Sequence, residues 1–267
     1  MIFASTMCYA LGKLLGYDAA VREVHKQLEK PTKSALPCVR AIARLREIDE
    51  VQLMIDSAAT SIAKARSRAF HAAHASGADT WFMVDDDCEA TTDTLDSLRT
   101  AARTGQQGLV IAPCLLREQD RVNVAIYRTA LNRKLADGAT IYRAHCGGLA
   151  IAAMGRTGMD VIEKRYRDEL VYEDHDGEQR LALFIESLAG GQWLGEDVAF
   201  CARADAAGVV VEALGTGVTM HAGKALLLNE VQNYRGLEDD PGGELHGKKT
   251  YEPPTVTDET ELPARFR

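Results

Sequence analysis

The chain has 267 residues, of which 46% are hydrophobic and 26% charged, a balance typical of a folded protein with a substantial core. Its 31 basic and 39 acidic residues give a formal net charge of −8. Bulk charge therefore does not favour a polyanionic partner, and a nucleic-acid partner would need a local basic patch.

The sequence carries few signals that indicate a cellular compartment. The sequence has no run of eighteen apolar residues, which predicts no transmembrane helix, and the apolar start lacks the basic residues of a signal peptide. The six cysteines form no Cys-x-x-Cys pair. Their spacing predicts buried thiols in a reducing, cytoplasmic setting rather than a zinc site or a disulfide framework.

The first half of the chain alternates between strand and helix patterns. The apolar runs predict strands at 2–8, 51–55 and 80–84. The helical periodicity and its punctuation predict helices at 16–29, 60–75 and 91–103, with a mixed segment at 36–46. This succession favours a parallel sheet that is covered by helices.

The second half is less regular. Closely spaced strands are expected at 109–112, 122–127, 141–143 and 149–152, and the lack of helices between them predicts antiparallel pairing. An exposed charged loop is expected at 165–180, a helix at 198–206, and extended segments at 209–213 and 217–220. The polar, Pro- and Gly-containing end predicts one domain over 1–225 and a C-terminal tail over 226–267.

Three adjacent carboxylates, Asp85, Asp86 and Asp87, directly follow the apolar strand at 80–84. Mutual repulsion in such a cluster is relieved by a cation or by water. Ligands of open α/β sheets bind beyond the carboxyl ends of the strands, which is where these residues would lie. In an extended chain Asp85 and Asp87 would point to one side and could meet one Mg²⁺ or Mn²⁺ ion. The alternative is a solvated acidic turn that caps the next helix.

Three further features carry potential chemistry. Glu196 and Asp197 open a predicted helix, where a carboxylate can act as a general base or can simply favour the helix dipole. His221 follows a short extended segment and is either a metal ligand or a structural histidine. The pair Gly147-Gly148 either lets backbone approach a ligand closely or makes a turn.

The order of these features resembles the A-type nucleotide-sugar glycosyltransferases, in particular bacterial and phage members of their broad inverting family. The matching stretches are Ile62–Arg68, Trp81–Leu98, Cys146–Ile151, Gly195–Gly208 and Met220–Gly223, so that the resemblance covers about residues 1–225. It implies a single-domain, three-layer α/β sandwich with a mostly parallel central sheet.

The resemblance also implies roles for the matched residues. Asp85 would face the donor ribose or the metal, Asp87 and His221 would bind Mn²⁺ or Mg²⁺, and Asp197 would be the catalytic base with Glu196 in support. The nucleotide-sugar donor would lie against the residues Thr6, Arg66, Asp85, Asp86, Gly147 and Gly148, with the glycine pair near the acceptor.

The sequence therefore predicts a metal-dependent transferase that moves a sugar from a UDP- or GDP-sugar to an acceptor hydroxyl with inversion. The acceptor stays open among a polysaccharide, a protein, a lipid head group and a modified DNA base. Two other interpretations remain. One is a metal-dependent phosphoryl or nucleotidyl transferase, although the sequence contains no P-loop. The other is a cation-dependent sugar-binding module without catalysis.

Overall fold

The computed structural model describes residues 1–7, 17–56, 61–104, 108–115, 123–126, 133–189, 191–221 and 224–227. The predicted C-terminal tail lies outside these ranges from residue 228 onward. Within them, no helix combines the length and apolar character needed to cross a bilayer. The cysteines at 38, 88, 114, 146 and 201 are buried thiols, as predicted, whereas Cys8 lies outside the described residues.

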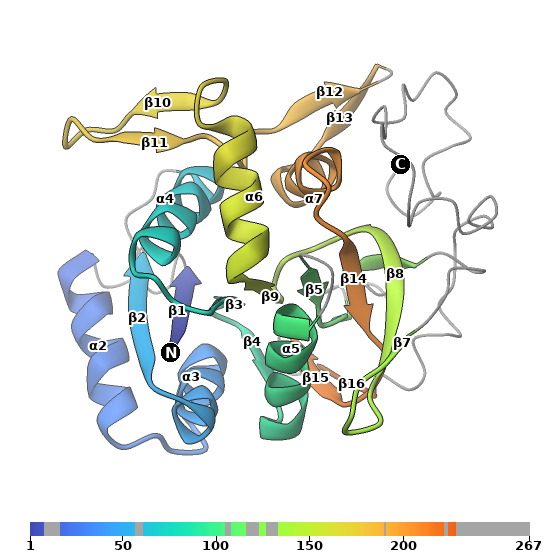
Figure 1. Cartoon of the computed structure of the whole chain (residues 1–267). Helices are drawn as coiled ribbons and strands as arrows, with labels where there is room; N and C mark the ends of the chain where they lie inside the picture. The colour runs from blue at the N-terminus through green and yellow to red at the C-terminus, as the bar shows by residue number, and fades with distance from the viewer. Residues whose placement is uncertain are drawn as a thin grey trace.

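A nine-stranded sheet forms the middle layer (Figure 1). Its order is β2 (Val51–Asp56), β1 (Ile2–Met7), β3 (Thr80–Asp85), β9 (Ile151–Gly155), β5 (Leu109–Ile111), β14 (Val211–Leu214), β8 (Thr140–Gly147) and β6 (Val124–Ile126), with β7 (Arg133–Lys134) also paired to β8. Only β8 and β9 run against the other strands of this sheet. Most strands therefore share one direction, and the two reversed strands supply the antiparallel pairing predicted for the second half.

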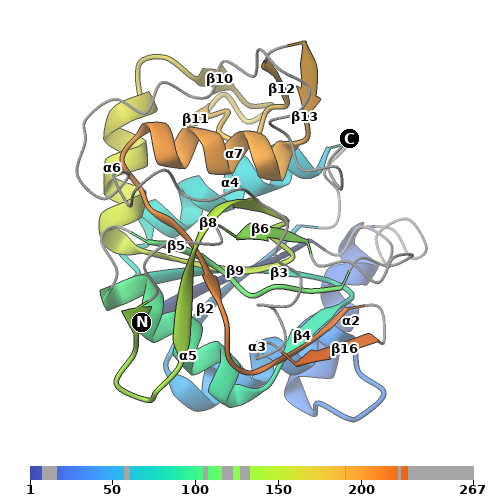
Figure 2. The ribbon, with the colours of Figure 1, turned by 90° about the vertical axis from the view of Figure 1, so that its right-hand side faces the viewer.

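Helices cover both faces of the sheet (Figure 2). One layer contains α4 (Ile62–Ala75), α6 (Arg156–Tyr166) and α7 (Glu196–Ala206), and the other contains α2 (Tyr17–Glu29), α3 (Pro37–Ile48) and α5 (Thr92–Thr104). This arrangement confirms the predicted three-layer α/β sandwich with a mostly parallel sheet.

Smaller sheets extend the domain. β4 (Cys88–Ala90), β15 (Val218–His221) and β16 (Lys224–Leu227) form a three-stranded sheet just after β3. The hairpins β10 (Val171–Glu173)–β11 (Gln179–Leu181) and β12 (Ser187–Ala189)–β13 (Gln192–Leu194) lie on the side of α4, α6 and α7 (Figure 1).

Two helices differ from the sequence expectation. The segment at 36–46, expected to be mixed, forms α3, with Pro37 in its first turn and buried residues at helical spacing from Cys38 to Leu45. α6 was not predicted because charged residues dilute its apolar face, yet Met159, Ile162 and Tyr166 recur at helical spacing and are buried.

The expected exposed loop at 165–180 is wrong in part, because it contains the end of α6 and the hairpin β10–β11. The Asp174 side chain is fully buried between its ion-pair partners. Lys64 and Arg68 of α4 and Arg180 of β11 each place a nitrogen 2.6 Å from an Asp174 carboxylate oxygen. These charges fasten the hairpin to α4.

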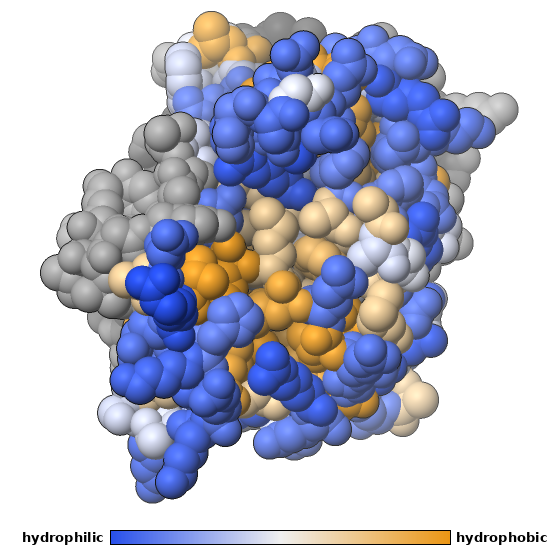
Figure 3. Space-filling view, turned by 90° about the vertical axis from the view of Figure 1, so that its left-hand side faces the viewer, coloured by the Kyte–Doolittle hydropathy of each residue, from blue (hydrophilic) through white to orange (hydrophobic). Residues whose placement is uncertain are grey.

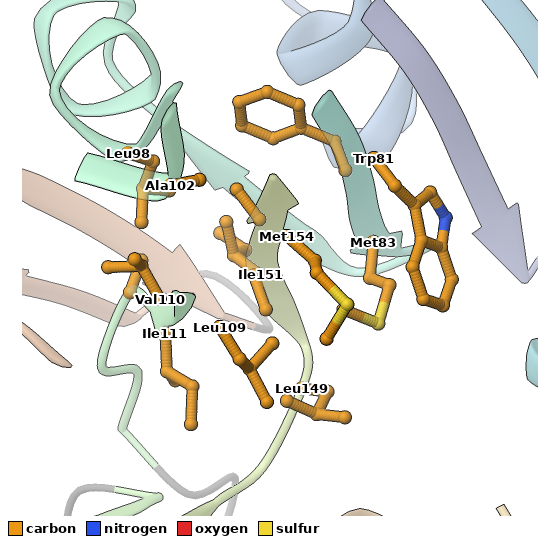
Figure 4. Packing of buried hydrophobic residues seen from close by; sticks show 14 of the residues in the cluster. Trp81, Met83, Leu98, Ala102, Leu109, Val110, Ile111, Leu149, Ile151 and Met154 are labelled. Carbon is orange, nitrogen blue, oxygen red and sulfur yellow. The ribbon is translucent and has the colours of Figure 1, made fainter. Parts of the chain in front are cut away.

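The main core lies around β3, β5 and β9 (Figure 4). Trp81 and Met83 of β3 pack near Met154 of β9, and Leu98 and Ala102 of α5 reach the same cluster. The fit between α5 and β9 leaves no space at Gly155, where a Cβ atom would lie 2.2 Å from the Ala102 carbonyl oxygen. Glycine is therefore required by the close approach of helix and strand.

The edge of the sheet that β2 forms is covered less completely than the two faces of the sheet. Figure 3 views the side of the molecule where α2 and β2 lie and shows hydrophobic residues in the middle of this face, with hydrophilic residues around them. The edge strand β2 lies on this side, and Val51, Leu53, Met54 and Ile55 within it are only half-buried.

Candidate functional site

The candidate site lies where neighbouring strands of the sheet end. β1 lies between β2 and β3, parallel to both, and Met7 at the end of β1 is paired with Asp85 at the end of β3. The chain leaves β1 toward β2 and then crosses back through α4 to β3. Asp85 is thus at a point where the strand order reverses, the place where open α/β sheets bind ligands.

Arg66 of α4 organises the site. It is 1% exposed, and its Nη2 donates to both carboxylate oxygens of Asp85 at 3.1 and 3.2 Å. Its Nη1 donates to Oδ1 of Asp197 and lies 3.5 Å from Oε1 of Glu196. One buried guanidinium therefore joins the end of β3 to the start of α7.

Asp197 is held from two sides. Besides the Arg66 contact at Oδ1, its Oδ2 accepts a hydrogen bond from the backbone N–H of Leu149 at 3.1 Å. Gly195 is the N-cap of α7 and makes no side-chain cap hydrogen bond. Asp197 instead lies in the first turn, with its carboxylate directed to Arg66 and Leu149.

Burial raises the pKa of Asp197 to about 6, and this effect outweighs the opposing attraction of Arg66. Burial also raises the pKa of Asp85, again against the attraction of Arg66. The pKa of Arg66 is lowered by its burial, but the three carboxylates around it reverse the effect and raise it. The cluster therefore contains a fixed cation and a carboxylate, Asp197, that changes charge close to neutral pH.

A second group of polar side chains lies just beyond Asp85. His221 of β15 places Nε2 3.3 Å from Oδ2 of Asp87, and its Nδ1 is bonded to the carbonyl oxygen of Leu115. The hydrogen bond to Asp87 is the main reason that the pKa of His221 rises to about 9. Ligand atoms of Asp87, Cys88 and His221 all lie within 4.8 Å of one another. This group could hold a metal ion.

The two aspartates of the expected metal pair have different partners. Asp85 contacts Arg66, whereas Asp87 contacts His221. The reason is local, because the chain turns at residues 86–87 instead of continuing as an extended strand. The prediction that Asp85 and Asp87 point to one side rests on extended geometry, which the chain does not have here. Asp86 lies in that turn, and its carbonyl oxygen accepts the N–H of Cys38 at 3.5 Å.

The remaining predicted positions have close protein neighbours. A Cβ atom on Gly147 would lie 2.9 Å from Cδ1 of Ile111, and one on Gly148 would lie 3.0 Å from Nδ2 of Asn123. The glycine pair thus packs against its own chain and leads to the Leu149 N–H that binds Asp197. Thr6 is fully buried near the carboxyl end of β1, where it is paired with Val84, the residue before Asp85.

Sequence reasoning missed several features. It did not connect Arg66 with the predicted catalytic carboxylates, and it treated Cys88 only as a buried thiol. It also overlooked Trp193, which pairs across the hairpin with Leu188. These two side chains are 67% and 69% exposed, and Trp193 precedes Asp197 by only four positions. A tryptophan so close to a predicted base is a sequence signal that was available.

Comparisons with known proteins bear on the fold. No protein-family model and no curated protein matches the chain. Similar solved structures include A197 from STIV, with 12% identity, a TM-score of 0.43, and coverage of 85% of this chain and 92% of that one. GalNAc-T7 with UDP, GalNAc and Mn²⁺ gives 10% identity, a TM-score of 0.42, and coverage of 83% and 43%. S. aureus TarS in complex with UDP-GlcNAc has 10% sequence identity and a TM-score of 0.42, and the match covers 93% of this chain and 61% of the TarS chain.

The chain thus spans less than half of GalNAc-T7 and under two thirds of the TarS chain. Similarity at this level carries no argument about activity, which has to come from the chemistry of the site itself.

Proposed function

We propose that the chain is a metal-dependent glycosyltransferase that uses a nucleotide-sugar donor. The observation that carries the proposal is the buried Arg66, which joins Asp85, Glu196 and Asp197 at the carboxyl end of the sheet. Beside this cluster lies a histidine–carboxylate pair suited to a cation. A base and a cation site side by side are the two elements that sugar transfer from a diphosphate requires.

In this proposal Asp197 is the general base. With a pKa of about 6 it is mostly ionised at neutral pH, yet basic enough to accept a proton. The acceptor oxygen attacks the anomeric carbon, the bond from that carbon to the diphosphate oxygen breaks, and the hydroxyl proton passes to Asp197. One carboxylate opposite the leaving group is sufficient for such a displacement, and we therefore propose inversion.

The residues present fit a divalent cation. Asp87 offers carboxylate oxygens, and the Leu115 carbonyl orients the His221 ring so that Nε2 faces Asp87. Mn²⁺ or Mg²⁺ held here would stabilise the negative charge that develops on the departing diphosphate. Arg66 would keep Asp85 and Asp197 in fixed relative positions while the donor and the acceptor enter.

The alternative of two-metal phosphoryl or nucleotidyl transfer needs more free carboxylates around the cation. In the described part of the chain, Asp85 is engaged by Arg66, and the group that could hold a metal contains one carboxylate, Asp87. A sugar-binding module without catalysis would not need a carboxylate such as Asp197, half-buried and with a raised pKa. Both features favour glycosyl transfer with one cation.

A donor screen tests the proposal. UDP- and GDP-sugars would be incubated with the chain in Mn²⁺, in Mg²⁺ and in chelator, and released nucleotide would be measured. We expect metal-dependent release of nucleoside diphosphate from one donor class, because water can replace the acceptor slowly. Release of nucleoside monophosphate or pyrophosphate would point to the alternative transferase. No metal-dependent binding or release with any donor would refute the proposal.

A further inference from the structure

We propose that Cys88 is a metal ligand, and that Asp87, Cys88 and His221 form a three-ligand site that binds Zn²⁺, Co²⁺ or Mn²⁺ in preference to Mg²⁺. The inference deepens the proposed function by naming the class of cation, and it rests on that function only for the use of the metal. The sequence predicted a hard, oxygen-rich site and placed no cysteine in it. The structure adds the Cys88 thiol to the group.

The ligand atoms lie close enough together for one cation. Around a tetrahedral ion with N and O at about 2.1 Å and S at about 2.3 Å, neighbouring ligand atoms lie about 3.4 Å (N to O) and about 3.6 Å (S to O) apart. Here His221 Nε2 lies 3.3 Å from one carboxylate oxygen of Asp87, Oδ2, and Cys88 Sγ lies 3.5 Å from the other, Oδ1. Ligand atoms of all three residues lie within 4.8 Å of one another, within reach of one cation.

The backbone keeps these side chains together. Cys88 is the first residue of β4 and is paired directly with His221 at the end of β15. Asp87 precedes Cys88 in the chain, in the turn that follows β3. Two strands and one turn therefore define the spacing without help from a bound ion.

The second contact of His221 is an independent sign of a metal site. Metal-binding histidines usually donate their other ring N–H to a carbonyl or a carboxylate, which fixes the tautomer and the ring orientation. The Nδ1 of His221 is bonded to the Leu115 carbonyl, so that Nε2 is the atom directed at Asp87 and Cys88.

The ligand types determine the preferred ion. A coordinating thiol binds as the thiolate, a soft donor that suits Zn²⁺ and related transition metals, whereas Mg²⁺ prefers an all-oxygen octahedron. Three protein ligands also match a catalytic type of site, in which one position stays open for water or substrate. A diphosphate oxygen is the natural occupant of that position in the proposed reaction.

Titration of the full chain with Co²⁺ tests the inference without any donor or activity. A cobalt–thiolate bond gives a near-ultraviolet charge-transfer band, and tetrahedral Co²⁺ gives intense visible bands. We expect both bands in the wild type, displacement of Co²⁺ by Zn²⁺, and no displacement by excess Mg²⁺. We expect Cys88→Ser to lose the charge-transfer band and to bind Co²⁺ more than about 100-fold more weakly, since losing even an outer partner costs about 10–100-fold.

Cys38→Ala is the matched control, because Cys38 is an equally buried cysteine on α3 and contributes no ligand atom to the group. It should keep the bands. Should Cys88→Ser fail to fold, Asp87→Asn in place of it should weaken Co²⁺ binding and alter the band. Wild-type Co²⁺ binding without a charge-transfer band, or an unchanged band in Cys88→Ser, would overturn the inference. A Co²⁺–thiolate site in a chain that transfers no sugar would refute the proposed function alone.

Discussion

The substitution Asp197→Asn removes one negative charge from the first turn of α7 and changes the side-chain shape very little. Arg66 keeps its contacts with Asp85 and Glu196, and the amide oxygen of Asn can still accept the Leu149 N–H. The variant should therefore fold, and it should bind metal and nucleotide almost as the wild type does. What it loses is the group that accepts the acceptor proton.

The size of the expected loss follows from general base catalysis, which typically contributes about 10²–10⁴-fold to the rate. We expect kcat for sugar transfer to fall by that factor with little change in the nucleotide Kd. The wild type should also lose kcat/KM in acid with an apparent pKa near 6, since Asp197 titrates there. That acidic limb should disappear in the variant.

The same carboxylate links stability to pH. Asp197 rises from its ordinary pKa of 3.8 to about 6 on folding, so that between these values the folded chain binds a proton that the unfolded chain has released. Its contribution to stability is full below about pH 4 and is lost as pH rises to about 6, which amounts to about 3 kcal/mol. Urea denaturation of wild type and variant across pH 4–7 should show a slope of this sign that Asp197→Asn lacks.

Asp205→Asn is the matched control, because Asp205 lies on the same helix and pairs with the buried Arg143 at 2.7 Å. It should lower stability and leave the pH profile of transfer unchanged. An Asp197→Asn enzyme with wild-type kcat would refute the assignment of Asp197 as the base, and Glu196 would become the next candidate. Loss of nucleotide binding in that variant, without loss of the fold, would also contradict the reasoning.

Three other perturbations separate the roles of named residues. Arg66→Gln should raise the pKa of the acidic limb of the transfer rate above about 6, and it should lower kcat more than it weakens nucleotide binding. A variant that only binds nucleotide more weakly would instead support the contact between Arg66 and the donor that the sequence resemblance implied. Asp174→Asn should reduce the free energy of unfolding by about 1–3 kcal/mol, because it removes the charge of a fully buried carboxylate that three half-buried cations share. Urea denaturation that shows no loss of stability would refute the fastening role of this residue. Gly155→Ala should cost at least about 1–3 kcal/mol in the same assay because its Cβ would overlap the Ala102 carbonyl, whereas Gly195→Ala, with open space around it, should cost less.

The layered fold was predictable because its signals are local. Apolar runs at β1 and β3 and the helical periodicity of α4 and α5 are each contained within one short segment. α6 was missed because its buried residues are interrupted by charges that exceed them in number. The hairpin around Asp174 was missed because its stability comes from Arg68, more than a hundred positions away in the chain.

The sequence indicated which residues belong to the candidate site, but not the contacts that join them. Carboxylates at a strand end and at a helix start marked Asp85 and Asp197 from the sequence alone. Their link through Arg66 depends on a contact between residues 131 positions apart, which no local pattern encodes. The split between Asp85 and Asp87 follows from one turn, and the entry of Cys88 into the metal group follows from the pairing of β4 with β15.

The charges of the site explain why a cation should be needed at all. Three carboxylates surround the single guanidinium of Arg66, so that the cluster carries a formal excess of negative charge. Arg66 is thereby engaged and cannot also neutralise an anionic diphosphate. Burial is the main cause of the raised pKa values of Asp85 and Asp197, and the neighbouring carboxylates add to it. Under the proposed function, a cation between these carboxylates and the diphosphate would offset their repulsion, and Asp87 and His221 would hold it on the side of the cluster where the strands end.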